Sequence, residues 1–179
     1  LHNTALISHV IVAAVIMMAG GIQLIPKVRQ KFPKLHRYSG RVYITGALIG
    51  AIGGLIMVWY TQGAVGDLPQ HLGISLDAIL ILVFGTLAWK TAINRKFVEH
   101  RRWALRLFIV TNAVWFFRLG LPLWLMINQA PVGFDPKTFT GPFLSILAFA
   151  DYLVPLAILE LYFWGQKQNK ASVRYGITG

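Results

Sequence analysis

Four histidines are the residues in this sequence best suited to bind a metal cofactor. They form two pairs with nearly equal separation along the chain, His9 with His71 and His36 with His100. A b-type haem between helices needs two facing imidazoles and basic groups near its propionates. Arginines flank the second pair, at Arg37, Arg41, Arg101 and Arg106. Haem is therefore one candidate ligand.

The position of the second pair also fits a simpler interpretation. His36 and His100 lie in connectors, just before apolar segments, whereas haem ligands usually lie inside such segments. Histidines in connectors can cap helices and form hydrogen bonds at the membrane interface, while neighbouring arginines bind lipid phosphates. The four flanking arginines are thus candidates for binding either propionates or lipid phosphates.

A second group of ionisable residues lies within the apolar segments, where a charge costs about 2.5 to 3.5 kcal/mol on insertion scales. At about 1.5 Å rise per residue, Arg118 and Asp151 reach the same depth and His9 and Asp77 share a shallower one. This predicts an ion pair that fixes helix register, or a polar pocket for a quinone head group or a proton path, with Arg118 as a cofactor residue. Glu160 lies on the helix face opposite Asp151 and can instead pair with Arg106.

These residues must be positioned by membrane helices. The chain has 179 residues, of which 56% are hydrophobic and 13% charged, with a mean hydropathy of +0.59. Its apolar residues form five blocks long enough to cross a bilayer as helices. We predict an all-α integral membrane protein with a single domain, residues 1–179, and spans at about 4–25, 42–60, 72–89, 103–127 and 141–164.

The formal net charge of +11 indicates topology and not nucleic-acid binding. Connectors rich in Lys and Arg alternate with neutral ones, and basic connectors stay on the cytoplasmic side. The alternation predicts an inner-membrane protein with its N-terminus outside and its C-terminus in the cytoplasm. Trp and Tyr residues at most span ends support these boundaries.

Small residues recur every fourth position in the second span, at Gly46, Gly50 and Gly54. Such a face lets another helix approach closely, so we predict that it packs against partner helices, including those of other membrane subunits. The sequence contains no cysteine, no nucleotide-binding loop, no zinc-binding helix and no serine nucleophile elbow. We therefore assign no catalytic residue and no site for a free metal ion.

The two histidine-containing entries to the second and fourth spans resemble each other, which suggests two parallel helical hairpins followed by a fifth helix. The residues that carry this repeat, in the runs 34–43 and 98–108, together with the run 118–122, resemble a bacterial family of predicted membrane proteins, domain of unknown function 2306. The pattern positions that the resemblance implies are His9, Gln23, His36, Arg41, His100, Arg106 and Arg118. Members of that family usually carry one more span, and the chain opens at Leu1 without Met, so we expect an upstream segment.

Two functions follow from the sequence. The first is a non-catalytic membrane subunit or binding module that packs against partner helices and anionic lipid. The second is a redox membrane protein that binds haem b or quinone, similar to four-helix cytochromes b. The resemblance assigns no activity.

Overall fold

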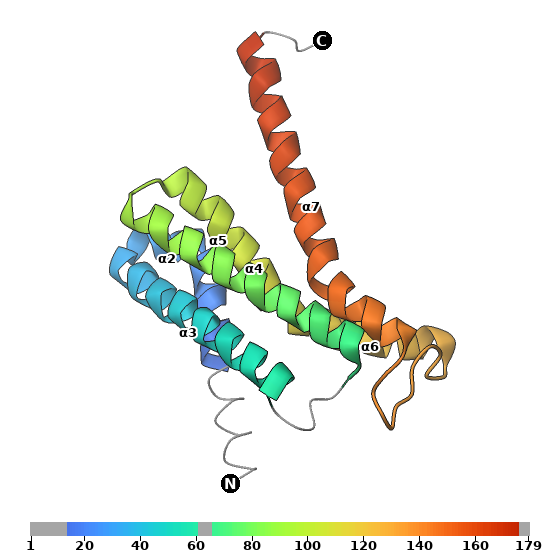
Figure 1. Ribbon diagram of the computed structural model, residues 1–179. Helices are drawn as coiled ribbons and strands as arrows, with labels where there is room; N and C mark the ends of the chain where they lie inside the picture. The colour runs from blue at the N-terminus through green and yellow to red at the C-terminus, as the bar shows by residue number, and fades with distance from the viewer. Residues whose placement is uncertain (1–13, 61–65, 176–179) are drawn as a thin grey trace.

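The protein is a bundle of α-helices (Figure 1). The computed structural model describes residues 14–60 and 66–175, with side chains up to residue 168. After a first apolar helix, Ala14–Leu24, the order is α2 Pro26–Lys31, α3 Pro33–Tyr60, α4 Leu68–Ile93, α5 Phe97–Thr111, α6 Ala113–Asn128 and α7 Pro142–Tyr175. The only β pairing within these described ranges is an isolated bridge between Asp135 and Thr140. The predicted all-α class is confirmed.

Three helices are long and apolar enough to cross a bilayer: α3, α4 and the Pro142–Gln168 part of α7. A fourth span is formed if α5 and α6, which meet at a bend of 43°, cross together. The described part of the first helix is shorter than a span, and residues 4–13 of the predicted first span lie outside the described ranges. The described helices thus account for three to four membrane spans.

The helices that follow connectors begin earlier than hydropathy alone predicts. Pro33 is the first residue of α3, where proline is favoured because its missing N–H has no helical partner. The predicted spans began at about residues 42 and 103, whereas α3 and α5 begin at Pro33 and Phe97. His36 and His100 therefore lie in the first turns of helices and not in connectors, which corrects the sequence-based placement.

Asp67 fixes the N-terminal end of α4. Its carboxylate caps α4 by accepting a hydrogen bond from the backbone N–H of Gln70 at 3.1 Å, and it also accepts one from the Ser145 hydroxyl on α7. Desolvation raises the pKa of the Asp67 carboxyl, but these hydrogen bonds together outweigh it and hold that pKa below its ordinary value. The charged carboxylate therefore joins the ends of α4 and α7.

The predicted fourth span is not one continuous helix. It breaks at Asn112, whose side-chain amide donates to the carbonyl of Phe108 at 2.7 Å. Asparagine competes in this way with the helical hydrogen-bond ladder. Pro122 and Pro155 lie inside α6 and α7, which continue through them.

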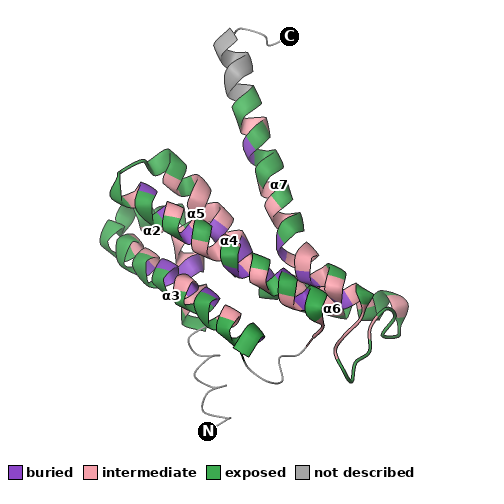
Figure 2. Ribbon diagram, in the orientation of Figure 1, coloured by how far each residue is buried: buried purple, intermediate pink, exposed green. Residues whose placement is uncertain are grey.

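The core lies where the first helix, α3, α4 and α5 meet, and it continues to α7. Leu107 and Ala88 are fully buried in the first region, and Val110 and Tyr152 in the second. Figure 2 shows buried residues along the inner helix faces and exposed ones outside. Large apolar side chains remain exposed there, such as Ile49 and Leu161. An exterior with so many exposed apolar side chains suits lipid and not water.

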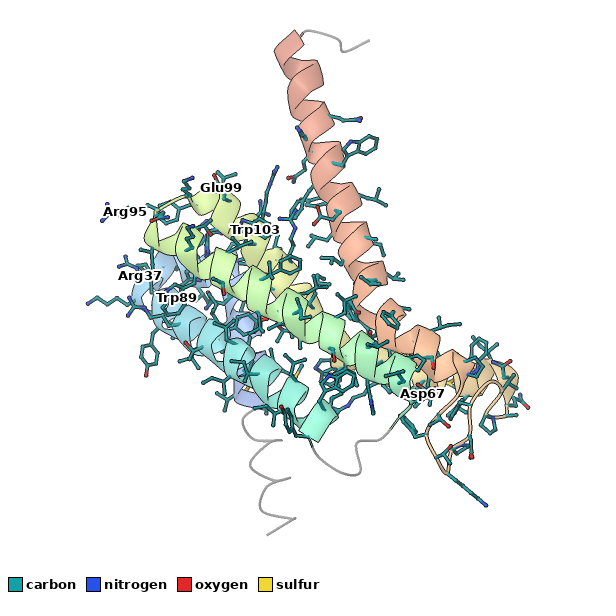
Figure 3. The ribbon with its side chains drawn as sticks, viewed as in Figure 1. Arg37, Asp67, Trp89, Arg95, Glu99 and Trp103 are labelled. Carbon is teal, nitrogen blue, oxygen red and sulfur yellow. The ribbon has the colours of Figure 1, made fainter. Side chains whose placement is uncertain are left out.

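The two ends of the bundle differ in charge. Figure 3 shows Arg37 and Arg95 at one end, with Trp89 and Trp103 nearby, and Asp67 at the other end. The α2–α3 and α4–α5 connections therefore bring their basic residues to a single end. This arrangement is what a membrane protein with one basic face requires.

Candidate functional site

The first turns of α3 and α5 bring two of the predicted cofactor residues together. His36 and His100 are both half-buried, and they lie near enough for their charges to interact. Arg29 on α2 also reaches His36 electrostatically. The fold thus places His36 and His100 in one region of the bundle, with the positive charge of Arg29 nearby.

The ring of His100 is held by the backbone of α4. Its Nδ1 lies 2.9 Å from the carbonyl oxygen of Ala88, a residue with no exposed surface. A carbonyl can only accept, so Nδ1 carries the hydrogen and donates it. In the neutral imidazole, Nε2 then keeps its lone pair. Histidines that bind metals commonly have their other ring nitrogen fixed by such a contact.

His36 offers a buried nitrogen without a partner. Its Nδ1 is inaccessible to solvent and makes no hydrogen bond to the described residues. The backbone around it is fixed by Gln23, whose amide donates to the His36 carbonyl at 3.1 Å and to the Ser39 hydroxyl at 2.6 Å. Gln23 thereby ties the first helix to the start of α3, and the resemblance had already included it among the pattern positions.

The pair therefore offers two imidazoles carried by different helices, α3 and α5. His100 Nε2 makes no hydrogen bond to the described residues, whereas His36 Nδ1 is enclosed, so the side chains around it would have to move before it could bind a ligand. The described residues offer no site for a free metal ion, because they contain no group of three or more His, Asp or Glu side chains placed to hold one. Only a cofactor that brings its own equatorial ligands, such as haem, suits two imidazoles.

The four predicted arginines divide between different surroundings. Arg106 donates to both carboxylate oxygens of Glu160, one of them at 2.8 Å, as the sequence suggested. It also lies over the rings of Trp103 and Phe163, at 4.6 and 5.2 Å from their centroids. Arg106 is therefore already neutralised. The other three are exposed: Arg37, Arg41 and Arg101.

The second histidine pair is described only in part, because His9 lies outside the described residues. His71 is half-buried in the first turn of α4, and its Nε2 is buried without a partner among them. Its ring meets Trp59 edge-on, with centroids 6.2 Å apart. Ser75 bridges these two residues, since it donates to the His71 carbonyl and accepts from the Trp59 indole. His71 thus has an ordered site of its own.

The intramembrane acids come together in a way that depth did not predict. Asp77 on α4 and Asp151 on α7 interact electrostatically, and each has one buried oxygen without a partner among the described residues. The buried Tyr152 hydroxyl donates to the Gly73 carbonyl at 3.2 Å, which locks the two helices at this level. The pair of ionisable residues within the bundle therefore consists of two carboxyl groups, and not of a carboxyl group and an arginine.

Arg118 does not form the predicted ion pair with Asp151. It is exposed on α6, and the salt bridges among the described residues are Lys96–Glu99 and Arg106–Glu160. The Asn112 break separates α6, which carries Arg118, from α5, which ends at Thr111. Nearby, the Trp115 indole donates to the Met17 sulfur at 3.0 Å.

The glycine stripe is used partly inside the chain. A Cβ at Gly46 would lie 2.7 Å from the Ile16 side chain, so the first helix packs there. At Gly50 and Gly54 no described atom lies within 4 Å of that position. Another close contact, which sequence reasoning missed, is at Gly73, where a Cβ would lie 2.7 Å from the Ala148 carbonyl oxygen.

Comparison with known proteins places the chain in a family. The family model described as predicted membrane protein (DUF2306) matches residues 6–155. The chain belongs to the DUF2306 family. The match confirms the resemblance and includes all four paired histidines as well as Asp77 and Asp151. No curated protein and no solved structure matches this DUF2306 chain.

Proposed function

We propose that the chain is a membrane redox protein that binds haem b between His36 and His100. The single observation that carries this proposal is the His36–His100 pair: two imidazoles from different helices, one oriented by the Ala88 carbonyl and one with an orphaned buried nitrogen. An oriented imidazole on one helix and a second imidazole with an unpartnered ring nitrogen on another support axial ligation. Bound haem would supply one-electron transfer.

The residues around the pair have separate roles in this proposal. Gln23 and the Ala88 carbonyl are positioning groups, because they fix the backbone and the ring of the two ligands. Arg29, whose charge reaches His36, and the exposed Arg37 and Arg41 are the candidates for propionate binding. Arg106 is omitted because Glu160 already neutralises it.

The proposal includes five spans in a bacterial inner membrane, with the N-terminus outside and the C-terminus in the cytoplasm. The basic end of the bundle, marked by Arg37 and Arg95, supports this orientation (Figure 3). The haem would then lie near the cytoplasmic face. A cysteine introduced at Gln62 should react with an impermeant thiol reagent from outside, and reaction only after lysis would reverse the orientation.

The test of the function is a visible absorption spectrum of the purified full chain before and after dithionite. We expect a Soret band, with α and β bands that sharpen on reduction and disappear in His36→Ala and His100→Ala. His71→Ala is the matched control. It also removes a half-buried imidazole, but at the N-terminal end of α4, whereas His100 contacts Ala88 near the C-terminal end of that helix. A colourless protein from cells with normal haem supply would exclude the proposal.

A second candidate function is a non-catalytic subunit that packs against partner helices and anionic lipid. The observation in its favour is the open face at Gly50 and Gly54. It predicts a colourless protein whose association with another membrane protein is lost in Gly50→Leu and Gly54→Leu. Quinone binding near Arg118 and Trp115 is the remaining redox alternative, and extraction of the purified protein with organic solvent would reveal a bound quinone.

A further inference from the structure

A small pocket lies between α5 and α7, next to the basic end of the bundle. Its volume is about 260 Å³. Residues one turn apart on α5 form one wall, and residues of α7 form the other. The lining consists of Phe97, Val98, Arg101, Arg102, Phe163 and Gln166.

The pocket carries positive charge that the described residues do not compensate. Arg101 and Arg102 belong to neither of the salt bridges found among them. The Arg102 guanidinium lies 5.5 Å from the centre of the Phe163 ring, which orients it without neutralising it. One turn further along α5, Arg106 differs because Glu160 pairs with it. The pocket thus has two free guanidinium groups.

The other lining residues suit the rest of a lipid molecule. Phe97 and Val98 are 68% and 73% exposed, and they provide an apolar edge one turn before the arginines. The Gln166 amide donates to the Tyr162 hydroxyl and adds a polar group on α7. An amphipathic site with paired guanidiniums, at the basic end of a membrane protein, matches a phosphate group attached to an apolar tail.

We propose that this pocket binds the phosphate of an anionic phospholipid, with Arg101 and Arg102 as its ligands and Phe97 and Val98 against the lipid chain. The site does not depend on the haem proposal. It also separates Arg101 from the histidine pair: the sequence left Arg101 open to propionate or lipid phosphate, and its place in the α5–α7 pocket favours the lipid.

Native mass spectrometry of the full chain in detergent tests this proposal. Phosphatidylglycerol and phosphatidylcholine with identical acyl chains are added in turn, and inorganic phosphate alone is a third arm. We expect phosphatidylglycerol to bind at least about tenfold more tightly than phosphatidylcholine, and the double variant Arg101→Gln/Arg102→Gln to lose that preference. Phosphate alone should bind much more weakly.

The matched control is Lys31→Gln/Lys34→Gln, which removes the same charge from exposed positions in the basic α2–α3 connection, outside the pocket. It should keep the preference. Equal losses in the two double variants would show general attraction to anionic lipid and overturn the site, as would unchanged binding in the pocket variant. Tight binding of inorganic phosphate alone would overturn the lipid assignment. The single variant Arg101→Gln should still fold, because the Arg101 side chain is exposed. It therefore tests the loss of lipid preference in a folded protein.

Discussion

Replacing Gly73 with alanine tests the α4–α7 contact that brings Asp77 and Asp151 together. The added Cβ would lie 2.7 Å from the Ala148 carbonyl oxygen and 3.1 Å from the Ala148 Cβ. The first of these neighbours is backbone, so it cannot rotate away. The helices would have to separate by about 0.7 Å to restore an ordinary contact of 3.4 Å. That movement also lengthens the Tyr152 hydrogen bond to Gly73 beyond its normal range.

The expected cost can be worked out from these two effects. Overpacking of a tight contact costs about 1 to 3 kcal/mol, and a hydrogen bond between membrane helices contributes about 0.6 kcal/mol. Alanine also makes a helix interior about 0.5 to 1 kcal/mol more stable than glycine does. The matched control is Gly165→Ala on α7, where no described atom lies within 4 Å of the added Cβ. Helix propensity cancels in this comparison, leaving a difference of about 2 to 4 kcal/mol.

The assay is thermal unfolding of both variants in a mild detergent, followed by tryptophan fluorescence. Gly165→Ala should match or exceed the wild-type Tm. Gly73→Ala should fall at least about 4 °C below Gly165→Ala, from the usual scaling for a chain of this size. Equal Tm values would refute the close approach of α4 and α7 at Gly73.

Three further predictions use the same unfolding assay. Asp77→Asn should stabilise the protein by up to about 3 kcal/mol, because an amide bears none of the cost of ionising a carboxyl within the bundle beside Asp151; a lower Tm would mean that an attractive partner holds Asp77. Glu160→Gln should destabilise it by about 0.5 to 1 kcal/mol, since Arg106 loses a partly exposed ionic partner; no change would make that pair incidental. Hydrogen bonds lower the folded-state pKa of Asp67. The stability that its cap contributes is therefore complete above the unfolded-state pKa of about 3.9. It is lost as the pH falls through the folded-state pKa. Asp67→Asn should remove this acid sensitivity, and an unchanged pH profile would contradict the cap.

The membrane class and the uneven charge of the two ends could be predicted because composition controls both. Apolar blocks identify helices that can span lipid, and clusters of Lys and Arg identify connectors that share one face. The location of His36 and His100 in one region of the bundle was also predictable, since both residues precede apolar blocks that follow basic connectors. Their positions within helices were not, because Pro33 and the first turn of α5 begin those helices ahead of the apolar blocks.

The partners of the intramembrane charges could not be predicted from depth along each helix. Depth gives a level in the membrane, whereas pairing depends on which helices touch and how each is rotated. Asp151 meets Asp77 and not Arg118 because α7 packs closely on α4 at Gly73, and because the Asn112 break redirects α6. Gly73 lies in no repeated small-residue pattern, so only its contact with Ala148 reveals its importance.

The most direct test of the central claim is the haem content per chain of the full-length protein, measured as the pyridine complex. Wild type should contain at least one haem b per chain, and His100→Ala should lose the haem bound between His36 and His100. His71→Ala should retain that haem. Equal haem content in His100→Ala and wild type would contradict the assignment of His36 and His100 as its ligands.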